Sequence, residues 1–260
     1  MHPLQTIAVR AARAAGDTIM RATENMDKVK TDVKGRNDFV TDIDKRAEER
    51  IIETIQKTHP NHAFLGEESG EHLSENSDND VVWIIDPIDG TTNFIRGMPH
   101  FCVSIAAQVK GKIEVAVVYD PVREELFTAS RGNGAQLNGK RIRVSQAREL
   151  QQTLLATGFP FRSVEQFDEY MTAFSKLYPK CSDMRRAGSA ALDLAYVAAG
   201  RFDGFWEYGL KWWDIAAGSL LVSEAGGIVS DLKGNPNFKN GESILAANPK
   251  IFKAILNTLK

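Results

Sequence analysis

Residues 83–94 read WIIDPIDGTTNF and carry two carboxylates directly after an apolar run. Asp86 and Asp89 stand where the predicted strand ends, and carboxylates in such a place hold hard divalent cations such as Mg²⁺. Gly90 and the two threonines after it predict a turn that opens a helix and offers N–H groups and hydroxyls to a phosphate. A metal site beside an anion site indicates metal-assisted phosphate chemistry.

Capping is the competing interpretation of these carboxylates, because Asp commonly caps a helix at a loop-to-helix junction. Asp86 and Asp89 are expected in a turn after the strand, and Pro87 fixes its own φ and stiffens that turn. Two carboxylates held close together raise each other's pKa unless a cation is present. A divalent ion therefore explains the pair better than capping does.

Length and charge are those of a globular enzyme. The chain has 260 residues, enough for one large domain or for two smaller ones that share an interface. Its formal net charge of −2 gives no electrostatic case for general nucleic-acid binding. The mixed charges of residues 28–38 predict a solvated loop.

Cysteine usage and the N-terminal sequence favour a cytoplasmic protein. Cys102 and Cys181 form no metal-binding motif, and Cys102 lies in an apolar run that predicts a small buried residue. The first residues lack the pattern of a secretory signal, and no run is long and apolar enough to cross a bilayer. We therefore expect no membrane association.

Hydrophobic periodicity predicts a mixed α/β (α+β) protein with an antiparallel meander near its middle, in which Lys110-Gly111-Lys112 marks one of the turns. The continuous apolar run at 81–85 predicts a strand buried on both faces. An exposed loop is expected at residues 70–80. The chain is expected to form one structural unit from an α+β half at 1–146, with the metal motifs, and an α/β half at 147–260. The expected helices span residues 4–19, 42–57, 164–178, 189–199, 214–225 and 249–259, and the expected strands span 63–65, 81–85, 103–109, 113–119, 125–129, 154–157, 203–206, 227–231 and 244–247.

Three further acidic segments become relevant beside Asp86 and Asp89. Asp38 and Asp44 flank the start of the second predicted helix, Glu67 and Glu68 sit in a Gly-Glu-Glu-Ser turn, and Asp214 follows two tryptophans at a helix start. Taken singly, each is more simply a helix cap or a solvated charge. These acidic residues can serve as metal ligands only if the fold brings them close to Asp86 and Asp89.

The sequence resembles the inositol monophosphatase family at these segments, in their order and spacing and over almost the whole chain. The block at 83–94 is highly specific, and the Trp-Asp block at 213–218 repeats that specificity independently. The wider sequence is most similar to the gammaproteobacterial member, which is also known as a component of a ribosomal RNA transcription antitermination complex. The matching blocks are residues 38–44, 66–69, 83–94, 188–191 and 213–218.

The resemblance implies a role for each matching residue. Two to three Mg²⁺ ions per subunit are implied, with Asp44 and Thr91 orienting the attacking water and Glu67 also catalytic. Gly90 and Thr91 N–H groups would hold the phosphate, and Arg185 would lie at the site edge. The implied metal ligands are Glu67, Asp86, the Ile88 carbonyl, Asp89 and Asp214, and the implied substrate-binding residues are Asp86, Ile88, Asp89, Gly90, Thr91, Arg185, Gly188, Ala190, Glu207 and Asp214.

The family also implies a fold and an activity. The fold would be the layered α-β-α-β-α sandwich of the inositol monophosphatase and fructose-1,6-bisphosphatase type. The activity would be lithium-sensitive hydrolysis of inositol 1-phosphate by a homodimer, through direct attack of water. No Cys or Ser nucleophile motif for a covalent phosphoenzyme is present in the sequence.

Two alternatives stay open. One is a related phosphatase that acts on fructose 1,6-bisphosphate, a nucleotide 3′-phosphate or NADP, since these enzymes share the metal motif. The other is a mainly non-catalytic scaffold that contacts RNA polymerase and transcription antitermination factors, with a consequent part in ribosome biogenesis. The acidic residues do not bear on the second alternative.

Overall fold

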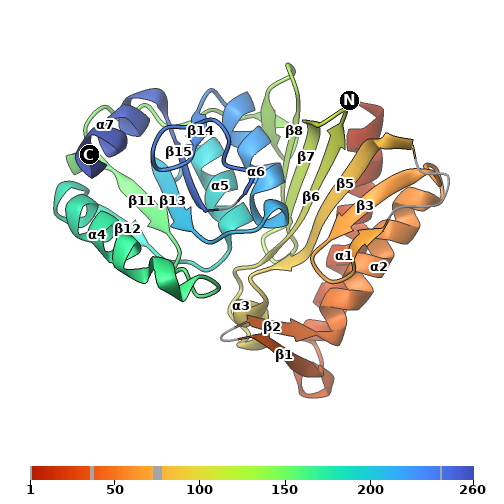
Figure 1. The fold of residues 1–260 in the computed structure, drawn as a ribbon. Helices are drawn as coiled ribbons and strands as arrows, with labels where there is room; N and C mark the ends of the chain where they lie inside the picture. The colour runs from red at the N-terminus through yellow and green to blue at the C-terminus, as the bar shows by residue number, and fades with distance from the viewer. Residues whose placement is uncertain (1, 36–37, 73–77, 241) are drawn as a thin grey trace.

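The computed structural model describes residues 2–35, 38–72, 78–240 and 242–260. Five layers succeed one another across the molecule in Figure 1: a helix pair, a large sheet, a second helix pair, a smaller sheet and a third helix pair. The predicted α-β-α-β-α sandwich is confirmed. The helices are α1 (Pro3–Thr23), α2 (Asp42–Gln56), α3 (Thr91–Ile95), α4 (Phe167–Leu177), α5 (Ala190–Ala198), α6 (Trp212–Glu224) and α7 (Pro249–Leu259), with short 3₁₀ turns at Met26–Lys28, Leu150–Gln152, Val164–Gln166 and Tyr178–Lys180.

The large sheet has the strand order β10-β9-β8-β7-β6-β5-β3-β4. Its strands pair antiparallel except for β3 and β5, which run parallel. The predicted meander is therefore confirmed. The strands are β3 (His62–Gly66), β4 (Gly70–His72), β5 (Asp78–Asp89), β6 (Cys102–Val109), β7 (Lys112–Asp120), β8 (Glu125–Ser130), β9 (Ala135–Leu137) and β10 (Lys140–Arg141).

Both faces of this sheet are buried, because helices cover each of them. Trp83 and Ile85 on β5 pack with α1 and α2, whereas Ile84 between them packs toward α5 and α6. This alternation follows from the two-residue period of a strand. A strand buried on both faces needs a continuous apolar run, which residues 83–85 provide.

The smaller sheet has the order β12-β11-β13-β15-β14 and lies between α5 and α6 on one side and α4 and α7 on the other (Figure 1). Its own core includes Leu155, Trp206 and Leu245, which pack with residues of α4 and α7. The strands are β11 (Leu154–Thr157), β12 (Asp183–Arg185), β13 (Gly204–Tyr208), β14 (Ile228–Ser230) and β15 (Ser243–Ala247).

Several local predictions are wrong. Residues 28–38 are not simply a loop, since β1 (Thr31–Gly35) pairs antiparallel with β2 (Asp38–Thr41). The run from Asp86 to Asp89 is not a turn but the end of β5, with a register irregularity between those two residues. The expected loop at 70–80 contains β4 and the start of β5, and its residues 73–77 lie outside the described part. The side chain of Asp38 also lies outside it.

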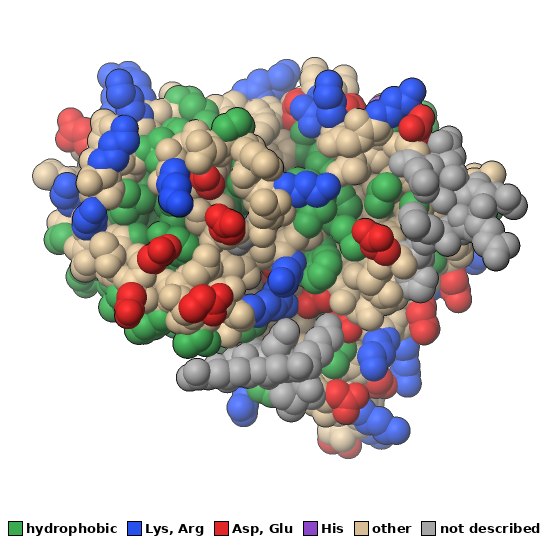
Figure 2. Space-filling model, viewed as in Figure 1, with side chains coloured by type: hydrophobic (Ala, Val, Ile, Leu, Met, Phe, Trp, Pro, Cys, Tyr) green, Lys and Arg blue, Asp and Glu red, His purple; other side chains and the backbone are tan. Residues whose placement is uncertain are grey.

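Figure 2 shows the surface of one face, on which acidic and basic side chains are interspersed. Cys102 is fully buried, as expected for a small core residue. None of the described helices has the length and apolar character needed to cross a membrane.

Candidate metal and phosphate site

Three carboxylates from distant segments converge between the large sheet and α6. One oxygen each from Glu67, Asp86 and Asp214 can be chosen so that all three lie within 4.8 Å of one another. Parallel pairing explains the first two, because Gly66 of β3 is in register with Ile85 of β5. The next residues in the two segments, Glu67 and Asp86, therefore lie at the same end of the sheet. Carboxyl ends of parallel strands meet at one sheet edge. Of the four carboxylates that the family resemblance implies as metal ligands, the structure brings these three together.

A residue of α2 holds the turn that carries Glu67 in place. The buried Glu48 carboxylate accepts hydrogen bonds from the N–H groups of Glu68 at 3.0 Å and Ser69 at 2.9 Å. The Glu67 N–H donates to the Ile85 carbonyl at 3.1 Å. The Glu67 backbone is thus fixed from both α2 and β5.

Asp214 enters the site from the first turn of α6. Its Oδ2 accepts a hydrogen bond of 2.6 Å from the N–H of Lys211, the residue that precedes α6. A helix N-terminus stabilises a carboxylate, because unpaired N–H groups and the helix dipole both favour negative charge there. The same residue therefore caps α6 and faces Glu67 and Asp86.

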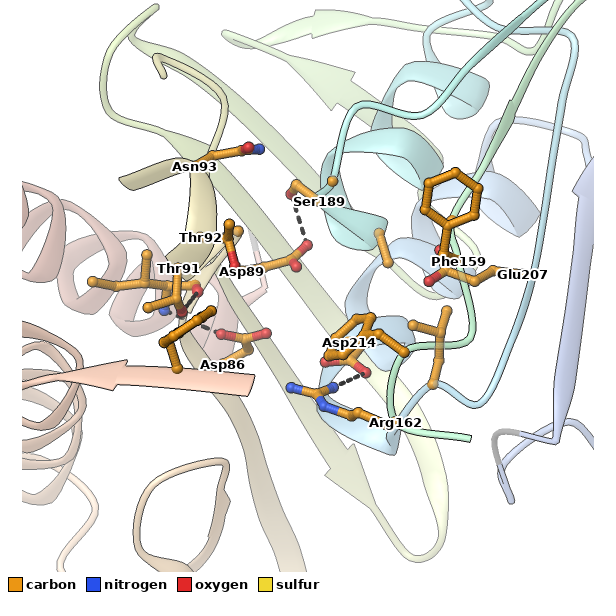
Figure 3. Close-up of a pocket in the computed structure, with 18 of the residues that line it drawn as sticks. Asp86, Asp89, Thr91, Thr92, Asn93, Phe159, Arg162, Ser189, Glu207 and Asp214 are labelled. Atoms are coloured by element: carbon orange, nitrogen blue, oxygen red, sulfur yellow. Dashed lines mark hydrogen bonds and ion pairs between the residues drawn. The ribbon is translucent and has the colours of Figure 1, made fainter. Parts of the chain in front are cut away.

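Arg162 binds two of these carboxylates at once. Its Nη2 lies 2.9 Å from Glu67 Oε1. Its Nη1 lies 3.1 Å from Asp214 Oδ2 (Figure 3). Arg162 lies between β11 and the 3₁₀ turn at Val164–Gln166, so the bridge joins two remote parts of the chain. The guanidinium supplies positive charge directly to this group of carboxylates.

Asp89 lies beside this group and is bound by the start of α5. Its Oδ2 accepts hydrogen bonds from the Ser189 hydroxyl at 2.7 Å and from the Ala191 N–H at 2.6 Å (Figure 3). Burial, reinforced by the nearby Asp214 carboxylate, raises the pKa of Asp89 to about 7. Asp89 is therefore close enough to interact with Asp214, although the three-carboxylate group above does not include it.

Burial and neighbouring charges also shift the pKa values of Asp214 and Asp86. Burial raises the pKa of Asp214 to about 6, against the lowering effect of the Arg162 guanidinium. Burial and the Glu67 carboxylate raise the pKa of Asp86 well above its usual range. Buried like charges of this kind are costly unless cations compensate them. An all-oxygen donor set of carboxylates fits Mg²⁺, so the residues present are suited to that ion.

Thr91 connects the site to α2. Its hydroxyl lies 3.0 Å from Asp44 Oδ1 and 3.0 Å from the Ile88 carbonyl oxygen, so its single hydrogen is donated to one of them at a time. Asp44 is buried, and its Oδ2 accepts from the Thr41 N–H at 2.7 Å and from the Thr41 hydroxyl at 2.5 Å. Asp44 is thus fixed in place with one oxygen directed to Thr91.

Gly90 forms the N-cap of α3 in a conformation that favours glycine. Its φ is +102°, and a Cβ atom there would lie 3.0 Å from the His100 carbonyl oxygen. A larger residue would therefore be strained and crowded. The backbone of residues 90–92 lines the cavity described next, at the start of α3.

These groups line one cavity of about 490 Å³. Gly188, Ala190 and Glu207 line it as well, as the family resemblance implies, and the buried Glu207 carboxylate packs against Gly158, where any Cβ atom would collide with it. Burial raises the pKa of Glu207 well above its usual range. Arg185 does not line the cavity: it is exposed on β12 and pairs with Asp183, whereas the next residue, Arg186, does line it.

Several lining residues were not singled out from the sequence. Arg162 had no local signal, because its partners are remote in sequence. Ser189 was part of a recognised block and, as an N-cap, had the usual signal of a serine before a helix. The cavity also includes Asn93, Phe159 and Arg186.

Comparisons with known proteins agree with this geometry. Residues 1–260 match the sequence model of the Inositol monophosphatase family. The chain is 58% identical over 260 residues to the Nus factor SuhB of Salmonella typhimurium (strain LT2), covering 100% of this chain and 97% of that protein. The crystal structure of the extragenic suppressor protein suhB from Bartonella henselae is 42% identical, with a TM-score of 0.95 over 99% of this chain and 98% of that one. The inositol monophosphatase from Anabaena (Nostoc) sp. PCC 7120 is 39% identical, with a TM-score of 0.87 over 98% and 94% of the two chains.

Proposed function

Because this chain belongs to the inositol monophosphatase family, we propose that it hydrolyses inositol 1-phosphate to inositol and phosphate with Mg²⁺ as cofactor. The observation that carries the proposal is the convergence of Glu67, Asp86 and Asp214 within 4.8 Å, with Asp89 hydrogen-bonded beside them. Buried carboxylates in this arrangement suit a hard divalent cation. The cavity they line also has room for a sugar-sized phosphate ester.

The ligands would be the carboxylates of Glu67, Asp86, Asp89 and Asp214 with the Ile88 carbonyl. Bound Mg²⁺ would lower the pKa of the attacking water and stabilise charge on the phosphoryl and leaving oxygens. The N–H groups of Gly90 and Thr91 would hold the phosphate at the start of α3. Proton transfer would then depend on side chains of the protein, which the next contacts hold in place.

Proton transfer would use the pair formed by Thr91 and Asp44. The Thr91 hydroxyl lies 3.0 Å from Asp44 Oδ1, and when it donates to that oxygen its lone pairs can accept a hydrogen bond from the attacking water. Asp44 would accept the proton through that hydroxyl. The two hydrogen bonds from Thr41 hold the Asp44 carboxylate in position for this transfer.

Recognition of the inositol ring would involve the opposite wall. Glu207 would accept hydrogen bonds from ring hydroxyls, beside the backbone of Gly188 and Ala190. These residues are also where related phosphatases for fructose 1,6-bisphosphate, nucleotide 3′-phosphates or NADP would differ. Exposed Phe159 at the cavity rim limits the space available to a larger substrate.

A panel of phosphate esters tests this proposal. Metal-free protein should be assayed on inositol 1-phosphate, fructose 1,6-bisphosphate, adenosine 3′,5′-bisphosphate and NADP, with Mg²⁺ or with EDTA. We expect inositol 1-phosphate to have the highest kcat/KM, activity to require Mg²⁺, and millimolar Li⁺ to inhibit. A faster rate on another ester would reassign the substrate, and full activity in EDTA would overturn metal catalysis.

A second function is favoured by the 58% identity, over the full chain, to a protein named as a Nus factor. We propose that this chain also binds the transcription antitermination machinery, independently of catalysis. Tagged wild-type protein and the Asp89→Asn variant should capture RNA polymerase and antitermination factors equally well. Failure of both proteins to capture them at physiological salt would overturn this role.

A further inference from the structure

Arg162 places a permanent positive charge inside the carboxylate group. The guanidinium bridges Glu67 at 2.9 Å and Asp214 at 3.1 Å, and the exposed fractions of the three side chains are 19%, 10% and 4%. Two N–H groups on different nitrogens are used, one toward each acid. Arginine suits this position because its planar fork can satisfy two acceptors and does not lose its charge.

The bridge and a metal ion require the same carboxylates. Glu67 and Asp214 are two of the three residues whose oxygens converge within 4.8 Å. A guanidinium that is hydrogen-bonded to both carboxylates places its positive charge close to any divalent ion that binds between them. Two positive charges this close repel each other strongly where little solvent screens them. Because arginine cannot be neutralised by deprotonation, its head must move away before the ion is fully bound.

The position of Arg162 in the chain allows such a movement. The residue follows Phe161 in a segment without helix or strand between β11 and the 3₁₀ turn at Val164–Gln166. Its guanidinium carbon lies 5.1 Å from the centre of the Phe161 ring. A long side chain on a loop can change rotamer without disturbing the sheet or α6.

We propose that Arg162 is an internal counterion that neutralises Glu67 and Asp214 in the metal-free protein and competes with the metal ion for them. This inference rests on the proposed function, since it assumes that the carboxylates bind a divalent ion. Arg162 is then a positioning residue: it keeps the acids together before metal binds and sets the metal concentration at which the site fills. The metal-free site would stay compact despite its acidic residues.

Direct metal binding tests the proposal without any activity assay. Mn²⁺ binding to metal-free protein should be measured by electron paramagnetic resonance of the free ion for the wild type, Arg162→Gln and Arg162→Lys. We expect Arg162→Gln to lower the dissociation constant for Mn²⁺ about tenfold, because removing a nearby positive charge removes a competitor. Arg162→Lys retains a charge and should stay closer to the wild type.

Arg131→Gln is the matched control, since Arg131 forms an exposed ion pair of 3.1 Å with Glu114 and does not line the cavity. It changes the net charge equally and should leave Mn²⁺ binding unchanged. Equal or weaker Mn²⁺ binding by Arg162→Gln than by the wild type would overturn the competition. If Arg162→Lys lowered the dissociation constant for Mn²⁺ as much as Arg162→Gln does, the competition would also be overturned.

Thermal unfolding gives a second measurement that remains informative if Arg162→Gln is unstable. In EDTA the melting temperature of Arg162→Gln should be lower than that of the wild type, and saturating Mn²⁺ should raise it by more degrees than it raises the wild type. An equal rise in both proteins would overturn the counterion role. If wild-type protein binds no Mn²⁺ at millimolar concentration, the proposed metal-dependent function fails together with the counterion role. If wild-type protein binds Mn²⁺ but Arg162→Gln binds it no more tightly, only the counterion role fails.

Discussion

The Ser189 hydroxyl donates a hydrogen bond of 2.7 Å to the Asp89 carboxylate, although 100 residues separate them. The Ala191 N–H donates to the same oxygen at 2.6 Å, so Asp89 of the large sheet lies at the N-terminus of α5. This contact joins the large sheet to the central helix pair at the site. It also leaves the other oxygen of Asp89 free of these two bonds.

Replacement of Asp89 by Asn should abolish most activity and preserve the fold. Asparagine keeps the size of the side chain, and its carbonyl oxygen can still accept from Ser189 and Ala191. The lost charge should weaken metal binding and lower kcat/KM for inositol 1-phosphate by at least about a hundredfold. Steady-state kinetics in saturating Mg²⁺, with circular dichroism as the fold check, measures this.

Ser189→Ala is the companion variant for that measurement. It removes the hydroxyl bond to Asp89 and the N-cap of α5 but keeps every carboxylate of the site. Loss of a cap costs about 1 kcal/mol, so we expect a modest fall in stability and turnover within about tenfold of the wild type. Near-normal turnover by Asp89→Asn would contradict the assigned role of Asp89.

Thr91→Ala should slow hydrolysis by about 10²–10⁴-fold, because it removes the hydroxyl between Asp44 and the expected position of the attacking water. The loss should fall on kcat, with a smaller change in KM. Thr91→Ser retains the hydroxyl and should recover most of the rate. Equal losses in both variants would show that the methyl group, not proton transfer, accounts for the effect.

Glu48→Gln should loosen the turn that carries Glu67. One of its two acceptor oxygens is replaced by an NH₂ group that faces the N–H of Glu68 or Ser69, leaving a buried donor without an acceptor. We expect the free energy of unfolding in EDTA to fall by about 1–3 kcal/mol and Mg²⁺ binding to weaken. Urea denaturation measures the first, with exposed Glu49→Gln as the control that should change neither.

The metal-free protein should lose stability as pH rises from about 5 to about 7. Burial raises the pKa of Asp89 to about 7 and that of Asp214 to about 6, so the folded protein binds these protons more tightly than the unfolded chain does. Carboxyl groups with a raised folded pKa stabilise the fold below the unfolded pKa of about 4, and this contribution is lost as pH rises through the folded value. Melting temperatures in EDTA across this range check the sign.

Metal should reverse that trend, because ligands bind in their ionised form and release protons. The rise in melting temperature caused by Mg²⁺ should therefore grow between pH 5 and pH 7. Asp89→Asn should show a shallower loss of metal-free stability over the same range, since it lacks one of the titrating groups. A wild-type melting temperature in EDTA that is constant or rising from pH 5 to pH 7 would contradict the assignment.

Much of the architecture was predictable, because apolar runs and their periods report local structure directly. The apolar run at 81–85 predicted a strand buried on both faces. The alternating packing of Trp83, Ile84 and Ile85 has that form, whereas Val81 and Val82 are only partly buried. Turn signals such as Lys110-Gly111 predicted the meander of β6, β7 and β8, and both residues have positive φ. The family resemblance supplied the layered sandwich.

The rest depends on contacts that no local pattern encodes. The β1–β2 hairpin has few apolar residues, so its mixed charges favoured a loop in the sequence. Arg162 lies 95 residues from Glu67 and 52 from Asp214, and only the folded chain brings their charges together. Arg185 and Arg186 are adjacent in sequence, yet only Arg186, the first residue after β12, lines the cavity.

Anomalous diffraction from crystals soaked in Mn²⁺ would show whether the carboxylates of Glu67, Asp86, Asp89 and Asp214 form a cation site. The predicted result is one Mn²⁺ peak at about 2.1 Å from oxygens of Glu67 and Asp86, and a second bound by Asp86, Asp89 and Asp214. Arg162 should have moved away from Glu67 and Asp214 in the same crystals. Crystals in saturating Mn²⁺ with no peak among these carboxylates would contradict the account.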